Sequence, residues 1–198
     1  MEPNWFKASK DIKLDINQED ANKETDIQSN LIESFSFDNF ISKETNEFAK
    51  KIAFEVSQHY GKLYNPLFIY GKNGLGKTHL INAIGNHITQ NSNKLVLYIT
   101  CKQFIDDVMK LDENSFKQKY SYVDVLLLDD LQDIKSSKKA QQILKDIIKD
   151  MISTEKQIVV TSNVITNDMY GIDYKLKNLL DSGMSVFICP NIENELVK

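Results

Sequence analysis

Apolar and polar positions alternate along the chain in blocks that predict both strands and helices. Five short apolar runs predict buried strands at residues 66–70, 95–100, 123–130, 157–163 and 185–190. Between these runs, apolar residues recur every three or four positions, which predicts amphipathic helices. The positions expected to face inward are Phe48, Ile52 and Val56, then Leu80, Ile81, Ile84 and Ile88, then Phe104, Ile105 and Val108, and then Ala140, Ile143, Leu144, Ile147, Ile148 and Met151. Because apolar strands alternate with helices, we expect an α/β fold: a three-layer sandwich around a five-stranded parallel sheet.

The first 34 residues differ in texture from the rest. Residues 1–34 are polar and weakly patterned, so we expect a flexible N-terminal segment followed by one folded core over residues 35–198. Within the segment, "QSNLIESF" (28–35) has the loose Q-x-x-L-x-x-x-F spacing of sliding-clamp-binding peptides; a plain linker running into the core is the alternative interpretation.

Composition narrows the cellular setting. The N-terminus lacks the basic-then-apolar order of a secretory signal, and no run approaches the ~18 apolar residues of a membrane span. Because there is no such run, we expect no membrane partner. Two cysteines, Cys101 and Cys189, are too few for a disulfide framework, so we expect the protein in a reducing cytoplasm. The net charge of -4 argues against a dedicated nucleic-acid binder. All 24 basic residues are lysine, so the chain lacks the planar fork of arginine.

The stretch "GKNGLGKT" (71–78) fits the phosphate-binding pattern G-x-x-x-x-G-K-[ST] between a predicted strand and a predicted helix. Its backbone is expected to fold around phosphates at the helix N-terminus. Lys77 is expected to reach the β- and γ-phosphates, and the Thr78 hydroxyl to bind Mg²⁺. The candidate nucleotide-binding residues are Gly71, Lys72, Asn73, Gly74, Leu75, Gly76, Lys77, Thr78 and His79. A chance glycine-rich turn is the alternative.

Polar residues follow two later apolar strands. After "VDVLLL", Asp129 is the candidate Mg²⁺ ligand and Asp130 the candidate group that polarises an attacking water; a solvated turn is the alternative. After "IVVTS", Asn163 is expected to contact the γ-phosphate, although an asparagine there can also serve as a cap. A whole strand, 95–100, separates the phosphate-loop strand from the acidic strand, which resembles the additional-strand ATPases. Lys77, Asp129, Asp130 and Asn163 are therefore the candidate catalytic residues.

The order and spacing of several motifs resemble the AAA+ domain of the bacterial replication initiator family DnaA. These motifs are "FSFDNFISKETNEFAKKIA", "YNPLFIYGKNGLGKTHLINAIGNHI", "FIDDVMK", "VDVLLLDDLQDI" and "IVVTSN", and the resemblance covers about residues 35–198. It implies an AAA+ fold that binds ATP or ADP with Mg²⁺. It also implies assembly through neighbouring ATPase domains and contact with single-stranded DNA.

The resemblance also implies an adenine pocket. The FDNF segment, ending at Phe40, would line it together with Ile41 and Asn46. The sequence departs from the family here, because "ISKE" stands where the family has a glycine, and Glu47 replaces its usual arginine.

Candidate single-stranded DNA contacts follow from the same resemblance. The segment between the second strand and the acidic strand is similar to the initiator-specific insertion, and it places Ile105 and Lys117 at contacting positions. Ser121 replaces a basic residue of the family, for which Lys119 is a substitute. In the alternative interpretation, Ile105 belongs to the core and Lys117 to the solvated surface.

Three departures shape the functional expectation. Where the family has an arginine finger that enters a neighbour's ATP site, "KLKNLL" places Leu179. We also expect no helical lid, because the sequence stops where the family continues into one. Neither a helix-turn-helix domain nor an N-terminal helicase-contact domain is recognisable.

The sequence therefore favours a DnaA-like ATP-binding protein that acts in replication initiation or regulates it, with little hydrolysis alone. Its expected partners are an initiator or a second copy, weakly held single-stranded DNA, and a replicative helicase or sliding clamp. One alternative is an excised or truncated initiator core. Another is an accessory ATPase of the helicase-loader type. A metabolic P-loop kinase is disfavoured, because no lid or basic substrate-binding groups are visible.

Overall fold

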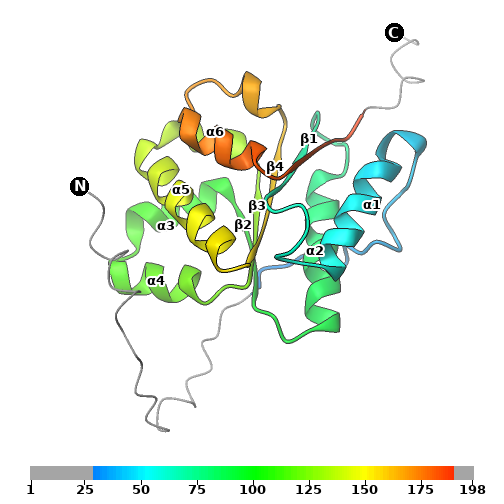
Figure 1. Cartoon of the computed structure of the whole chain (residues 1–198), viewed down its shortest axis with the longest axis horizontal. Helices are drawn as coiled ribbons and strands as arrows, with labels where there is room; N and C mark the ends of the chain where they lie inside the picture. The colour runs from blue at the N-terminus through cyan, green and yellow to red at the C-terminus, as the bar shows by residue number, and fades with distance from the viewer. Residues whose placement is uncertain (1–28, 190–198) are drawn as a thin grey trace, which may run out of the picture.

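The protein is a parallel sheet between two layers of helices (Figure 1). The computed structural model describes residues 29–189. Within this part of the chain the strands are β1 (Leu67–Tyr70), β2 (Val96–Thr100), β3 (Val125–Asp129), β4 (Gln157–Ser162) and β5 (Met184–Phe187). They lie in the order β2-β3-β4-β1-β5, and all neighbouring pairs are parallel. The expected α/β sandwich with five parallel strands is confirmed.

The helices divide between the two faces of the sheet (Figure 1). One face is covered by α1 (Glu44–Gln58) and α2 (Lys77–Asn91), and the other by α3 (Cys101–Lys110), α4 (Glu113–Ser121), α5 (Lys138–Ser153) and α6 (Tyr174–Asp181). Two 3-10 turns, η2 (Leu131–Ser136) and η3 (Thr166–Asp168), follow β3 and β4.

Alternation along β3 decides which face each side chain meets. Leu126 and Leu128 belong to the apolar cluster on the α5 side, whereas Leu127 belongs to the cluster under α2. Because successive strand residues point to opposite faces, Asp129 shares the face of Leu127. The carboxylate at the end of β3 therefore points toward the start of α2.

Most of the predicted helical stripes are buried, with informative exceptions. Phe48 was expected to face inward, but its side chain is 58% exposed on α1. The prediction for Phe48 is wrong, because Ala49, Ile52 and Val56 form the buried face of α1 and Phe48 lies outside it. Ile105 and Ile143 are only partly buried.

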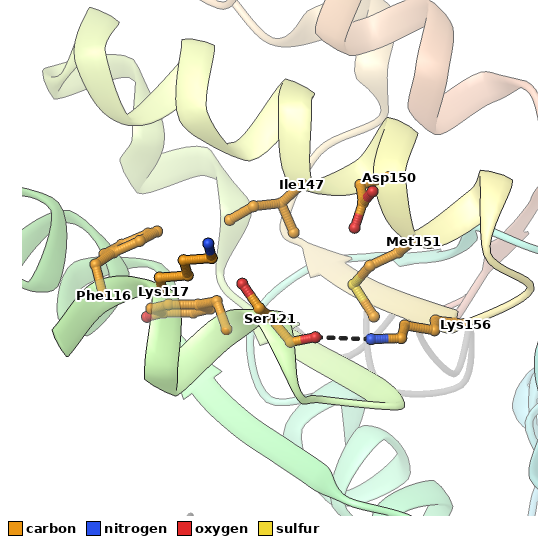
Figure 2. Close-up of a pocket in the computed structure, with 8 residues that line it drawn as sticks. Phe116, Lys117, Ser121, Ile147, Asp150, Met151 and Lys156 are labelled. Carbon is orange, nitrogen blue, oxygen red and sulfur yellow. Dashed lines mark hydrogen bonds between the residues drawn. The ribbon is translucent and has the colours of Figure 1, made fainter. Parts of the chain in front are cut away.

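The helix α4 was not predicted from the sequence. This helix has nine residues and buries only Phe116 and Tyr120, so its apolar period is too short to stand out. Figure 2 shows Phe116 from α4 and Ile147 and Met151 from α5 among the residues that line a small pocket of about 30 Å³.

Residues 29–36, here called the strap, cross α2 before the core begins. Ile32 donates its backbone N–H to Asn82 Oδ1 at 2.9 Å, and Asn86 Nδ2 donates to the carbonyls of Ile32 (2.9 Å) and Phe35 (2.7 Å). Leu31 packs on the α2-side cluster. The domain boundary expected at residue 35 stays a prediction, but the strap already contacts the core.

The candidate clamp-binding motif overlaps the strap. Its first residue, Gln28, lies outside the described residues. Leu31 is half-buried, and Phe35 stacks on His79 with ring centroids 4.5 Å apart. Both apolar positions of the motif are thus engaged within the domain.

None of the helices in residues 29–189 is long and apolar enough to cross a membrane.

We expect the Asn86→Ala variant to loosen the strap. The change removes two donors from a side chain that is only 7% exposed and leaves two strap carbonyls without them. The free energy of unfolding, measured with urea, should fall by about 1–3 kcal/mol. Asn91→Ala is the control, because Asn91 is exposed on the same helix and bonds only its own turn; it should change stability by less than ~0.5 kcal/mol. Equal effects of the two variants would show that the strap is not held this way.

Candidate functional site

The loop between β1 and α2 has the backbone of a phosphate cradle. Gly74 and Gly76 adopt positive φ values of 79° and 91°, which favour glycine. A Cβ on Gly76 would lie 2.9 Å from Phe40 Cε2, whereas one on Gly74 would meet nothing within 4 Å. Phe40 therefore lies directly against the loop at Gly76. The N-terminus of α2, with its free backbone N–H groups, follows at Lys77.

Lys77 is folded back into this loop. Its side chain is buried, and Nζ donates to the carbonyls of Gly71 at 2.7 Å and Lys72 at 3.0 Å. Burial lowers the pKa of Lys77, while the carboxylates of Asp130 and Asp129 act in the opposite direction. The ammonium group is thus positioned where the loop would hold phosphate oxygens.

Asp129 is the most heavily hydrogen-bonded carboxylate of the site. It is 2% exposed, and Oδ2 accepts from Thr78 Oγ1 at 2.8 Å and from Tyr98 OH at 3.0 Å. Oδ1 accepts from Thr161 Oγ1. Burial, and then the charge of Asp129, raise the pKa of Tyr98, so its phenol stays a donor. A hydroxyl and a carboxylate that converge in this way are the hard oxygen ligands that suit Mg²⁺, so Thr78 and Asp129 fit the expected metal site.

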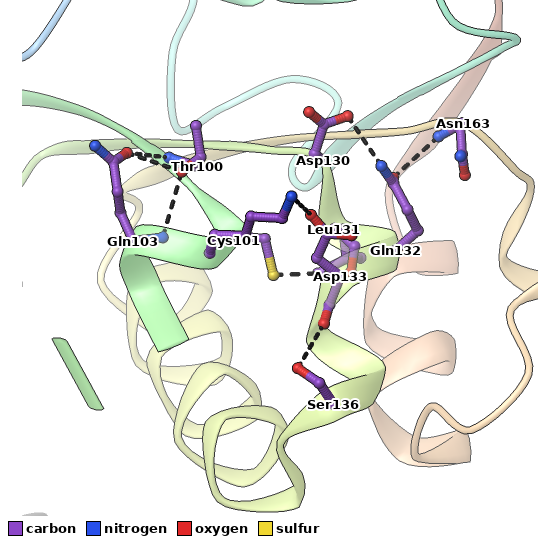
Figure 3. A network of polar contacts seen from close by, with 10 residues as sticks. Thr100, Cys101, Gln103, Asp130, Leu131, Gln132, Asp133, Ser136 and Asn163 are labelled. Atoms are coloured by element: carbon purple, nitrogen blue, oxygen red, sulfur yellow. Dashed lines mark hydrogen bonds and ion pairs between the residues drawn. The ribbon is translucent and has the colours of Figure 1, made fainter. Parts of the chain in front are cut away.

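Asp130 is fixed by a second set of contacts. Its φ of 60° lies in the left-handed region, and its backbone N–H donates to Thr161 Oγ1 at 3.0 Å. Figure 3 shows Gln132 between Asp130 and Asn163: Nε2 donates to Asp130 Oδ1 at 3.0 Å, and Oε1 accepts from the Asn163 N–H at 3.1 Å. Asp130 and Asn163, predicted from separate strands, therefore meet through Gln132. Their catalytic roles stay predictions.

A cleft of about 510 Å³ opens in front of the loop. The predicted residues that line it are Asn73, Gly74, Gly76, Lys77, Thr78, His79 and Asp130. Ile32 and Phe35 of the strap also line it. Ile32 was missed because residues 1–34 were interpreted as a linker, and Phe35 because no motif of the nucleotide site marks it. Lys72 is exposed and does not line the cleft, and Leu75 packs on the α2-side cluster.

The candidate residues of the adenine pocket differ in their exposure to solvent. Ile41 is 77% exposed. Asn46 is buried, but its side chain accepts from the Lys43 N–H at 2.8 Å and donates to the Ile41 carbonyl at 3.1 Å, so it caps α1. His79 Nε2 lies 2.8 Å from the Ser36 carbonyl, and its ring makes an edge contact with Phe40. Contact of Phe40, Ile41 and Asn46 with a base stays a prediction.

The DNA candidates and the finger position lie on the opposite layer. Ile105 is partly buried against the α5-side cluster, and Lys117 lines the small pocket between α4 and α5. Lys119 Nζ forms an ion pair with Asp107 Oδ2 at 2.6 Å. Ser121 accepts from Lys156 Nζ at 2.8 Å through its carbonyl (Figure 2). Leu179 on α6 packs partly into the same cluster.

Substitutions at the two loop glycines should separate backbone strain from steric contact. Gly74→Ala should cost about 1–2 kcal/mol in the free energy of unfolding, because only the left-handed backbone resists it. Gly76→Ala should cost more, because its Cβ also displaces Phe40. In a Phe40→Ala background the excess should shrink by at least ~0.5 kcal/mol, as a double-mutant cycle in urea would measure. Equal costs with additive behaviour would contradict the contact.

Comparison with solved structures places this geometry among replication initiators. Domain III of the Thermotoga maritima replication initiation protein DnaA is 36% identical with a TM-score of 0.76, over 81% of this chain and 69% of that chain. A replication initiator DnaA bound to AMPPCP and single-stranded DNA is 32% identical with a TM-score of 0.74, over 79% and 50%. The DnaC helicase loader, at 17% identity and a TM-score of 0.65 over 78% and 97%, shares the fold alone.

Sequence comparison identifies the same family. The chromosomal replication initiator protein DnaA of Dechloromonas aromatica is 40% identical over 168 residues, which are 82% of this chain and 36% of that protein. The chain thus spans about a third of the length of this curated relative. The family model described as the bacterial DnaA ATPase domain matches residues 31–187. This chain therefore belongs to the bacterial DnaA ATPase-domain family.

Proposed function

We propose that this AAA+ domain holds Mg-ATP in the cleft in front of residues 71–78 and acts in replication initiation or its regulation. The observation that carries the proposal is the convergence of Lys77, Thr78 and Asp129: a buried ammonium in the loop, and a hydroxyl bonded to a carboxylate at 2.8 Å. The AMPPCP-bound DnaA relative supports the same ligand class. Bound Mg²⁺ would supply charge neutralisation at the phosphates, while Thr78 and Asp129 hold it.

We propose that hydrolysis is slow when the protein is alone. An arginine finger contributes about 10³–10⁵ in rate in phosphoryl transfer. In this sequence Leu179 stands at the family's finger position, and none of the 198 residues is arginine. Leu179 is also partly buried against the core, so that position offers an apolar side chain and no cation.

The proposed partner is a replication initiator, or a second copy, that docks on an AAA+ face. This chain can present a loaded nucleotide site to a neighbour's arginine, but it has no arginine to return. Such a subunit would bind at one end of an initiator filament and stop its growth there. Single-stranded DNA is a weaker proposed partner, because Lys119 is already paired with Asp107 and leaves Lys117 as the candidate cation.

Lys77→Ala tests nucleotide binding. Removing an ammonium that pairs with bound phosphates should weaken ATP binding by roughly 30-fold or more, on the scale of 2–5 kcal/mol for a hydrogen-bonded charge. The affinity is measurable by titration with a fluorescent ATP analogue. Lys110→Ala is the matched control, because Lys110 pairs only with Asp106 on the surface of α3, and it should bind ATP as the unaltered protein does. Unchanged affinity in Lys77→Ala would refute the proposed site.

Turnover measurements test the second half of the proposal. The isolated protein should hydrolyse ATP at close to the background rate, and addition of the initiator from the same cell should raise turnover or change origin unwinding. The Lys77→Ala variant should lose that effect. Rapid turnover by the isolated protein would contradict the argument from the missing arginine. Capture of the replicative helicase without an initiator would favour the loader alternative.

A further inference from the structure

Two strand hydroxyls hold the carboxylate of Asp129 from opposite sides, and neither is among the candidate site residues predicted from the sequence. Tyr98 OH donates to Oδ2 at 3.0 Å, and Thr161 Oγ1 donates to Oδ1. Both residues are buried, Thr161 completely and Tyr98 at 8% exposure. Because each oxygen accepts from a hydroxyl of a neighbouring strand, the carboxylate loses the rotation about χ2 that is otherwise broad for aspartate.

The sheet order explains why these two residues meet Asp129. β3 lies between β2 and β4. Tyr98 is paired with Leu127, two residues before Asp129, and Val160 is paired with Leu128, which places Thr161 beside Asp129. Because side chains alternate along a strand, all three groups lie on the sheet face that α2 covers. The orientation of the Asp129 carboxylate, the candidate metal ligand, is therefore determined by residues of the two neighbouring strands.

Thr161 also reaches the second acidic residue. The same hydroxyl that donates to Asp129 accepts the backbone N–H of Asp130 at 3.0 Å. Asp130 has a φ of 60°, a conformation that costs a residue with a side chain about 1–2 kcal/mol and needs surrounding contacts to persist. One hydroxyl on β4 thus fixes the direction of Asp129 and the backbone of Asp130 together.

We infer that Thr161 and Tyr98 are positioning residues of the metal site: they orient Asp129 for Mg²⁺, and Thr161 also sets the place of Asp130. The inference rests on the proposed Mg-ATP site. Neither residue needs to touch the ligand. Their effect is expected in the dependence of nucleotide binding on Mg²⁺, and partners that orient a metal ligand commonly contribute 10–100-fold to metal affinity.

A purely structural role would predict a loss of stability alone, and the chain offers matched controls for it. Thr166 is a buried threonine whose Oγ1 donates to Asp181 Oδ1 at 2.8 Å. Tyr120 is a buried tyrosine whose OH donates to Asp107 Oδ2 at 2.6 Å. Thr166→Val and Tyr120→Phe remove the same bond type outside the site, so they should lower stability without changing the Mg²⁺ dependence.

The experiment measures binding of a fluorescent ATP analogue in EDTA and then across a Mg²⁺ titration. In EDTA, the Thr161→Val and Tyr98→Phe variants should bind within about 2-fold of the unaltered protein. In the titration, Thr161→Val should need ~10-fold more Mg²⁺, because it leaves Oδ1 without its hydroxyl donor and releases the Asp130 N–H. Tyr98→Phe should need a smaller excess, because Thr78 still donates to Oδ2. Thr161→Ser keeps the hydroxyl and should restore the unaltered Mg²⁺ dependence.

The possible failures are distinguishable. One outcome is that the two site variants bind the nucleotide at the same Mg²⁺ concentration as the controls Thr166→Val and Tyr120→Phe. In that case the positioning role is wrong, while the proposed function stands. If the unaltered protein binds no nucleotide in either condition, the proposed function fails and the inference fails with it. If Thr161→Val does not fold, Tyr98→Phe decides the question, because it leaves Asp130 untouched.

Discussion

The structure depends on how one buried negative charge is satisfied. Asp129 is almost inaccessible to water, and a buried carboxylate is costly unless donors replace its hydration. Its donors come from three elements: Thr78 at the start of α2, Tyr98 on β2 and Thr161 on β4. These donors meet only if β3 lies between β2 and β4 with α2 above that face. The strand order and the position of the phosphate loop are therefore tied together by a single charge.

The same charge is linked to the point where the chain enters the domain. Tyr98 holds Asp129 through its phenol, while its backbone N–H donates to the Ser29 carbonyl of the strap at 2.8 Å. Asn82 accepts from Ile32 of the strap and donates to the Thr78 carbonyl at 2.8 Å. The strap is thus bonded to residues on both sides of the candidate metal site. A change in the position of the strap would therefore alter the hydrogen bonds of Tyr98 on β2 and of Asn82, which bonds the first turn of α2.

Local sequence signals predicted the loop and its acids, but not the residues that hold them. The spacing "GKNGLGKT" and the carboxylates after an apolar strand identify Lys77, Thr78 and Asp129 without knowledge of the fold. Tyr98 and Thr161 were hydroxyls within apolar strands, and alternation alone gives each the right face. Their contact with Asp129 requires the spatial order of β2, β3 and β4, which sequence order does not reveal. The contact of Gln132 with Asn163 and the contacts of the strap with α2 were missed for the same reason, because they join segments distant in the chain.

The two faces of the domain differ in what they can contribute to catalysis. On the loop side, an ammonium, a hydroxyl and an oriented carboxylate are arranged within hydrogen-bonding distance of fixed partners. On α6, the position expected to serve a neighbour holds Leu179, whose side chain packs inward. The lysines of this chain do not replace the missing arginine finger, because an ammonium lacks the planar fork that matches a phosphate. The proposed completion of the site by another protein's arginine is consistent with both faces.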